Sequence, residues 1–163
     1  MKKTKRIALL GLTVALAMIM SYIEVLFPLN FAVPGIKMGL ANIVIVFVLY
    51  RMSLADAVTV SLVRVFLVSL LFGNFMSLAY SFTGAALSLA LMAILKKTEK
   101  FSVVGVSIVG GVMHNVGQIA MAVILMGTAQ IAYYLPVLVI TGTVTGVLIG
   151  LVSALVINRV KKI

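Results

Sequence analysis

Apolar residues fill the chain in six long segments, which are separated by short stretches of turn residues or charges. The segments cover about 7–27, 36–51, 54–72, 75–95, 102–126 and 134–157. Pro28 ends the first segment, Gly73 and Asn74 form a turn after the third, and a charge run at 96–100 follows the fourth. About 20 apolar residues are needed for a helix to cross the hydrocarbon core of a bilayer. The pattern therefore predicts an all-α, polytopic membrane protein with a bundle of six transmembrane helices.

Composition supports this class. Of the 163 residues, 64% are hydrophobic and 10% are charged, whereas soluble domains average about 25% charged residues. Six crossings leave no room for a soluble domain, so residues 1–163 are expected to form a single transmembrane domain. The basic residues at 2–6 followed by an apolar run imitate a signal peptide. That run is too long for a signal sequence and lacks a small-residue cleavage site, so we expect a retained first helix.

The positions of the basic residues predict the orientation. The chain has 13 Lys and Arg residues, and all except Lys37 and Arg64 lie at segment ends on one side of the predicted bundle. The loops 28–35, 73–74 and 127–133 contain neither Lys nor Arg. Because cytoplasmic loops are enriched in these residues, both termini are predicted to be cytoplasmic, in a multi-pass protein of the cell membrane. This placement beside anionic lipid headgroups also argues against nucleic acid as a partner.

Lys37 and Arg64 lie inside membrane-length apolar segments. An arginine at mid-bilayer costs about 2.5–3.5 kcal/mol on insertion scales, so such a charge indicates a functional site. The chain has only three acidic residues, Glu24, Asp56 and Glu99. Asp56 is two helical turns from Arg64, about 12 Å, which is too far for a direct bond. The excess of positive charge favours a cavity that receives a negatively charged or strongly polar ligand.

Other polar residues are predicted to lie in the same outward-facing half of the bundle. His114 and Gln118 share one helix face, and Asn115 lies about 100° away. The predicted ligand-binding set is Lys37, Asn42, Arg64, Asn74, Tyr80, His114, Asn115 and Gln118.

Several of these assignments have a structural alternative. Glu24 and Lys37 are equally well explained as an ion pair beside the outer loop, and Arg64 as a strut that bonds backbone carbonyls. His114, Asn115 and Gln118 are alternatively a hydrogen-bonded seam between helices.

Small residues form a second pattern. Gly142, Gly146 and Gly150 recur every four residues in the sixth segment, where we expect packing inside the bundle. The first segment contains Gly11, Ala15, Ala17 and Ser21 with similar spacing. An exposed groove of small residues there would suit docking of another membrane subunit, so these four residues are the predicted partner-docking positions.

Several classes of function lack their sequence requirements. The chain has no P-loop for ATP hydrolysis and no acidic cluster to hold Mg²⁺ against a diphosphate. It has no cysteine and one histidine, so no metal site and no cofactor are predicted. A non-enzymatic role in binding or permeation is therefore expected.

Four stretches together resemble the Gx transporter family, long labelled heptaprenyl diphosphate synthase component I. They are Pro34–Asn42, Leu71–Asn74, Met113–Gln118 and Tyr133–Pro136. That family is similar to the substrate-binding S components of energy-coupling factor transporters. The resemblance implies a ligand pocket that opens outward, a membrane coupling subunit and two cytoplasmic ATPases. It also implies docking through the first helix, whose small residues fill the S-component pattern loosely.

The leading hypothesis is a substrate-binding membrane subunit of an ATP-driven importer for a small polar or anionic metabolite. The alternative is a non-catalytic membrane subunit associated with polyprenyl diphosphate or quinone-precursor metabolism. Prenyl diphosphate synthases need aspartate-rich motifs, and Asp56 is the only aspartate here. A solitary carrier or channel is a third possibility.

Overall fold

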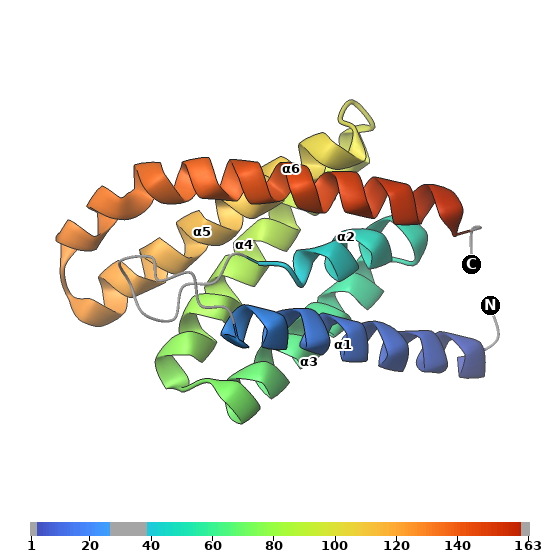
Figure 1. Cartoon of the computed structure of the whole chain (residues 1–163), viewed down its shortest axis with the longest axis horizontal. Coiled ribbons are helices and arrows are strands. Elements are labelled where there is room, and N and C mark those ends of the chain that lie inside the picture. Colours follow the sequence, from blue (N-terminus) through green and yellow to red (C-terminus); the bar gives the residue numbers. More distant parts are fainter. Residues whose placement is uncertain (1–2, 27–38, 161–163) are drawn as a thin grey trace.

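The computed structural model describes residues 3–26 and 39–160, and this part of the chain folds into six α-helices (Figure 1). They are α1 (Lys3–Leu26), α2 (Asn42–Arg51), α3 (Leu54–Phe72), α4 (Phe75–Thr98), α5 (Val103–Met126) and α6 (Leu135–Arg159), with a short 3₁₀ helix, η1 (Ala129–Tyr134), before α6. Five stretches, with η1 and α6 counted together, are long and apolar enough to cross a membrane. The predicted all-helical class is confirmed, and the five candidate spans fit the predicted multi-pass membrane protein.

The turn residues that separate the apolar segments act as helix caps. The side chains of Ser53, Asn74 and Ser102 each accept a hydrogen bond from the backbone N–H three residues later, at 3.1, 2.9 and 3.1 Å. Such bonds satisfy N–H groups that a helix start leaves unpaired, and they set where α3, α4 and α5 begin. The predicted end of the fourth helix at residue 95 was too early, because α4 continues to Thr98 and ends at Glu99, which has φ +56°.

The second helix differs most from its predicted range of 36–51. In the described residues α2 begins at Asn42 and has 10 residues, so it is about 15 Å long, half of a bilayer core. Its last residue nevertheless lies at the end of the bundle where α1 begins. Arg51 donates to the backbone carbonyl of Ile157 near the end of α6, and Ser53 bonds Asp56, which pairs with Arg6 of α1.

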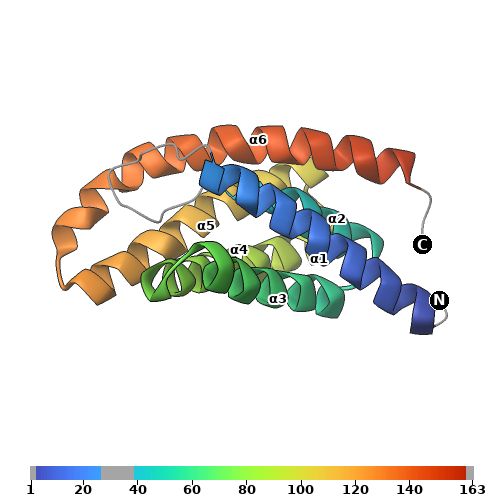
Figure 2. The same ribbon diagram turned by 60° about the horizontal axis from the view of Figure 1, so that its bottom comes forward.

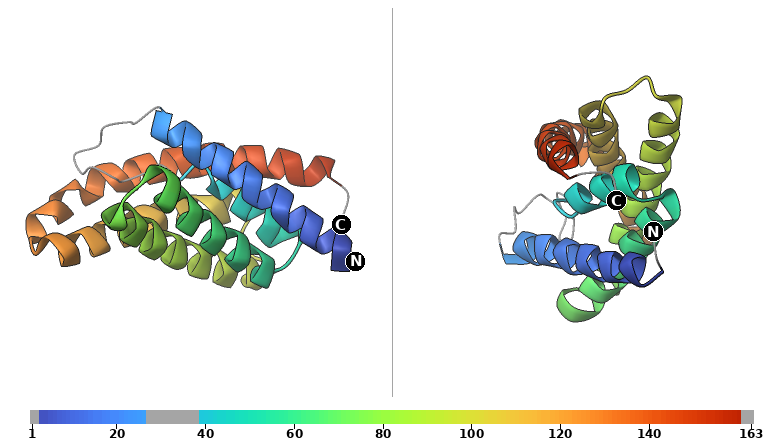
Figure 3. Two further views of the ribbon diagram at one scale, coloured as in Figure 1. Left: turned by 90° about the horizontal axis from the view of Figure 1, so that it is seen from below. Right: turned by 90° about the vertical axis from the view of Figure 1, so that its right-hand side faces the viewer.

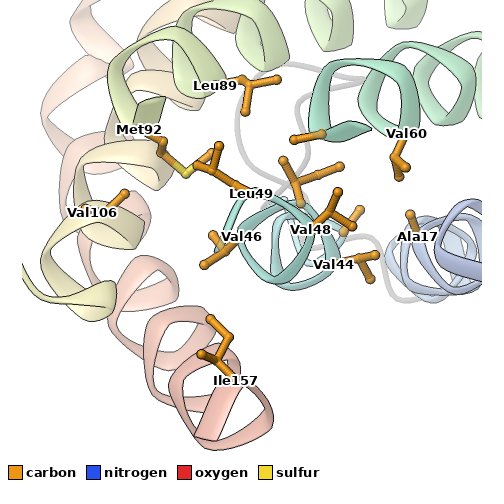
Figure 4. Close-up of a cluster of buried hydrophobic side chains, with 13 residues drawn as sticks. Ala17, Val44, Val46, Val48, Leu49, Val60, Leu89, Met92, Val106 and Ile157 are labelled. Carbon is orange, nitrogen blue, oxygen red and sulfur yellow. The ribbon is translucent and has the colours of Figure 1, made fainter. Parts of the chain in front are cut away.

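The short α2 lies at the centre of the bundle, and the main apolar core forms around it. Figure 4 shows side chains from the five longer helices directed toward α2, including Ala17, Val60, Met92, Val106 and Ile157. Six of the ten residues of α2 are buried and the other four are half-buried, as expected for a helix surrounded by the rest of the bundle. Its position is further fixed by Lys96, which donates to the carbonyl of Leu49.

The start of α1 and the end of α6 lie at the same end of the molecule (Figures 2 and 3). Apart from Arg64, the described basic residues all lie in the first turn of α1 or at or just beyond the ends of α2, α4 and α6. At the opposite end, the rings of Tyr22 and Phe72 are in contact, tilted by 42° with centroids 4.9 Å apart, and Phe75 and Tyr133 are exposed. Exposed aromatic residues are typical of a membrane interface. This distribution fits cytoplasmic termini, although the orientation itself stays a prediction.

Glycines bring α4, α5 and α6 close together. A Cβ atom on Gly146 or Gly150 of α6 would lie 2.7 Å from the Cα atom of Ile108 or Val104 of α5. On the other side of α5, a Cβ atom on Gly117 would lie 2.9 Å from the Cα atom of Gly84 in α4. The predicted packing role of the α6 glycines inside the bundle is therefore confirmed.

We expect Gly146→Ala to destabilise the protein by about 1–3 kcal/mol, because the added methyl group collides with backbone rather than with a side chain that can move. Gly11→Ala is the matched control, since a Cβ atom there meets nothing within 4 Å and alanine favours a helix by up to about 1 kcal/mol. Thermal unfolding in detergent measures both variants. Equal melting temperatures for the two would contradict the packing described here.

The Asp56 carboxylate should stabilise the attachment of α1 to α3. It is buried and accepts bonds from the Nε and Nη2 atoms of Arg6 at 2.9 and 2.6 Å and from Ser53 Oγ at 2.7 Å. Because the Arg6 side chain is half exposed, Asp56→Ala should cost only about 1–2 kcal/mol. The control is Glu99→Asn, which removes an exposed carboxylate and tolerates positive φ. A melting temperature of the Asp56 variant no lower than that of the control would sink this assignment.

Candidate functional site

Arg64 is near the middle of α3 and points into the bundle. Its side chain is 3% exposed, and its Nη1 atom donates to Ser21 Oγ on α1 over 3.4 Å. In residues 3–26 and 39–160, its Nε and Nη2 atoms have no hydrogen-bond partner. The strut alternative requires backbone carbonyls to accept bonds from the guanidinium. In the described part of the chain no backbone carbonyl does so.

Glu24 lies one helical turn after Ser21 and links α1 to the segment before α2. Its Oε1 atom accepts a bond from the backbone N–H of Leu40 at 2.8 Å. In the described residues no carboxylate lies within 4.0 Å of the Arg64 guanidinium. Lys37 lies outside the described residues, so its predicted ligand contact and its ion pair with Glu24 both stay predictions.

The residues that lead into α2 pack closely against polar side chains. Gly39 has φ +86°, which suits glycine, and a Cβ atom there would lie 3.1 Å from Asn42 Nδ2 and 3.6 Å from His114 Cδ2. The N–H groups of Asn42 and Ile43 already bond the carbonyls of Gly39 and Leu40 at 2.8 and 3.1 Å. The start of α2 therefore has few donors left for an anion, whereas Arg64 offers a buried positive charge.

His114 and Gln118 of α5 face the same neighbour. Both are buried, and a Cβ atom on Gly84 of α4 would lie 2.8 Å from the His114 carbonyl oxygen and 2.9 Å from Gln118 Cγ. Asn115 points elsewhere, as its position 100° away on the helix predicts. Its Nδ2 atom donates to the carbonyl of Leu138 in α6 at 2.7 Å. For Asn115 the structure thus favours the alternative of a seam between helices.

Two predicted ligand contacts lie apart from these groups. Asn74 is exposed and caps the start of α4. Tyr80 is buried in an apolar cluster with Ile119 and Leu138, and its hydroxyl donates to the sulfur of Met76 at 3.2 Å. These contacts assign Asn74 to capping and Tyr80 to packing.

The predicted docking residues do not share one face of α1. Ala17 and Ser21 are fully buried in the bundle, Ala17 in the core around α2 and Ser21 against Arg64. Gly11 and Ala15 are exposed. Only the latter two are accessible to a partner in this structure.

The remaining groups form what we call the central polar cluster: Ser21, Glu24, Asn42, Arg64, His114 and Gln118. Ser21 bonds Arg64, and Glu24, one helical turn further along α1, bonds Leu40. Gly39 lies close to Asn42 and His114, and Gln118 lies one turn after His114 on the same face of α5. Sequence reasoning assigned Ser21 to docking and missed its contact with Arg64. The spacing of three residues between Ser21 and Glu24, which puts them on one helix face, was the available signal. Nothing in the sequence indicated that Gly84 faces His114.

The cluster offers hydrogen-bond donors and acceptors together with one guanidinium. Within the described ranges, no three His, Cys, Asp or Glu side chains gather as a metal site requires. The arrangement is suited to binding a polar molecule rather than to holding a metal ion.

Comparison with known proteins agrees with the motifs in the sequence. The model of the family described as heptaprenyl diphosphate synthase component I matches residues 13–156. No curated protein and no solved structure matches the chain, and the likeness to S components stays a prediction. The matched range begins in α1, ends in α6 and includes the whole central polar cluster. The chain therefore belongs to the heptaprenyl diphosphate synthase component I family.

Proposed function

We propose that this chain is the substrate-binding membrane subunit of an importer, and that it binds a small anionic or polar metabolite at the central polar cluster. The observation that carries the proposal is the state of Arg64. Its guanidinium is buried, and in the described residues it bonds only one neutral hydroxyl, which leaves two donor atoms available.

A cation in this state opposes stability. A buried charge without a full set of partners costs several kcal/mol, and a hydrophobic residue of similar size is often neutral or stabilising at such a site. Selection for a stable bundle alone therefore does not explain Arg64. An anionic ligand that bonds the two available donors would supply the missing interaction.

The depth of the cluster supports loading from one side. Arg64 is eight residues before the end of α3, about 12 Å, and Glu24 is two residues before the end of α1. Glu24 lies toward the end of the bundle opposite the basic residues, and Arg64 lies near mid-depth. With the predicted orientation the end near Glu24 is the outer side, so the ligand would enter from outside.

Energy for import would come from separate proteins, because the sequence lacks a P-loop. The expected partners are a membrane coupling subunit and cytoplasmic ATPases. α1 supports this expectation, since its most apolar stretch is only 17% buried and Gly11 and Ala15 are exposed on it.

Arg64→Met should abolish ligand binding and leave the protein folded. Small molecules that co-purify with the detergent-extracted wild type, identified by mass spectrometry, should be missing from this variant. The ligand-stripped variant should melt at the same temperature as the stripped wild type or higher, because an incompletely paired buried charge has been removed.

Arg6→Met is the matched control for this experiment. It removes an arginine that already pairs with Asp56, so it should lower stability and keep the ligand. Unchanged ligand binding by Arg64→Met, or a clear fall in its melting temperature, would return Arg64 to a structural role.

The family description favours one alternative, a non-catalytic membrane subunit associated with polyprenyl diphosphate metabolism. A groove of about 480 Å³ between α3 and α4 fits this function. Its lining is almost entirely apolar, and includes Leu62, Phe82 and Ala90. Several of these residues are exposed toward the position of lipid, so an isoprenoid chain would fit there.

Affinity purification from membranes in mild detergent separates the two functions. The importer predicts recovery of P-loop ATPases and a membrane coupling protein, whereas the alternative predicts a soluble, aspartate-rich prenyltransferase.

Replacing Gly11 and Ala15 with leucine should abolish ATPase recovery without unfolding the chain. Val144→Leu, on the exposed face of α6, is the control and should recover the same partners. Recovery of the prenyltransferase alone would reject the importer.

A further inference from the structure

The groove between α3 and α4 runs along the surface of the bundle. Its volume is about 480 Å³, and its lining is almost entirely apolar. Four large side chains of the lining are about half exposed: Leu54, Leu62, Phe82 and Ile94. Other lining residues are buried and form the floor, among them Val65, Ala85 and Leu89. The groove is therefore an apolar channel that opens toward the position of lipid.

Short side chains on α4 create this space. Ala86, Ala90 and Ala93 line the groove at intervals of about one helical turn. An empty space of this size would deprive its lining of dispersion contacts. The molecules that surround the bundle in a bilayer are lipids, so an apolar chain is expected to fill the groove.

The dimensions of the groove match one acyl chain of one leaflet. Along α3 the lining begins at Leu54, the first residue of the helix, and reaches Val65, about 16 Å further on. Half of a hydrocarbon core is about 15 Å thick. A volume of 480 Å³ over this length gives a width of about 6 Å, whereas a helix with its side chains is about 10–12 Å across. The groove therefore suits an acyl chain better than a helix of a partner protein.

A lysine lies at the basic end of the groove. Lys97 follows Ala93 and Ile94 by about one turn of α4, so it lies on the helix face that lines the groove. Its side chain is exposed, and within the described residues no carboxylate lies within 4.0 Å of its ammonium group. Lys96 is directed into the bundle, where it bonds the carbonyl of Leu49. Lys97 is thus available to an anionic group at the level of the lipid headgroups.

The other end of the bundle lacks such a charge. A second apolar groove of about 400 Å³ continues past Leu62 and Phe82 toward the end of α3. None of the basic residues in 3–26 and 39–160 lies at that end. Charge therefore distinguishes the groove at the basic end from its continuation.

We propose that the groove between α3 and α4 binds one anionic phospholipid from the leaflet at the basic end of the bundle. The acyl chain fills the groove, and the phosphate pairs with Lys97. A zwitterionic phospholipid fits less well, because its own cation competes with Lys97 for the phosphate. This site is separate from the central polar cluster, so the inference does not depend on the importer function.

The test uses the whole chain, delipidated in detergent and returned to vesicles with equal amounts of phosphatidylglycerol and phosphatidylcholine that carry identical acyl chains. Native mass spectrometry of the protein released from these vesicles identifies the lipid that stays bound. We expect phosphatidylglycerol to be preferred about fivefold, as the attraction of one lysine for an anionic surface predicts. Equal retention of the two lipids would overturn the proposal.

Ala90→Leu tests the contact with the acyl chain. The added side chain would occupy part of the groove, so lipid retention should fall about tenfold, which corresponds to roughly two CH₂ groups left unburied. Ala8→Leu, at an exposed position of α1, is the matched control and should retain lipid as wild type does. Unchanged retention by Ala90→Leu would place the lipid elsewhere.

Lys97→Gln tests the headgroup contact separately. It should remove the preference for phosphatidylglycerol and keep retention of phosphatidylcholine. Arg159→Gln removes one positive charge from the exposed last turn of α6 at the same end of the bundle, and it should keep the preference. An equal loss of preference in both variants would assign it to the overall charge of that end and overturn the site.

Protein extracted directly from cell membranes distinguishes the other occupants. A phospholipid retained by wild type and lost from Ala90→Leu supports the proposal. A polyprenyl diphosphate retained in its place would assign the groove to the alternative function and overturn the proposal. A dimer that Ala90→Leu dissociates would identify a second copy of the chain as the occupant, which would overturn it as well.

Discussion

The constraint on which this structure depends is the lack of water in a hydrocarbon core, where the protein itself must satisfy each backbone N–H and C=O group. A continuous helix meets this requirement internally. α2 has only 10 residues, so the backbone of residues 39–41 before it needs other partners. Leu40 bonds Glu24, and the first turn of α2 bonds Gly39 and Leu40. The polar cluster lies at the start of α2, where side chains such as Glu24 satisfy backbone groups that no regular helix satisfies.

Two kinds of packing surround this cluster. α4, α5 and α6 approach so closely at Gly84, Gly117, Gly146 and Gly150 that added methyl groups would collide with backbone. Such contacts make one dense wall, against which His114 and Gln118 are buried. α1 is attached differently, through Arg6–Asp56, Ser21–Arg64 and Glu24–Leu40. These polar bonds to α3 and to the segment before α2 add to the apolar packing of Ala17 in the core around α2.

The sequence predicted most helix boundaries because turn and capping residues act locally. Ser53, Asn74 and Ser102 end apolar segments and also bond the next helix start. The predicted start of α2 at residue 36 was wrong, because an apolar run indicates that a segment is buried and does not indicate whether its backbone is helical. Arg64 was selected as a candidate because an intramembrane cation is unusual whatever its neighbours are, and its function stays a prediction. Asn115 and Tyr80 were harder, because a buried polar side chain looks the same in sequence whether it contacts a ligand or the next helix.

The bond between Ser21 and Arg64 gives α1 a mechanical consequence. The exposed face of α1 carries Gly11 and Ala15, and its buried face carries the hydroxyl that orients the guanidinium. A rigid helix transmits a tilt along its whole length. A force on the exposed surface of α1 would therefore move the Ser21 hydroxyl and, through it, Nη1 of Arg64. A ligand bound to the guanidinium would in turn change the tilt of α1.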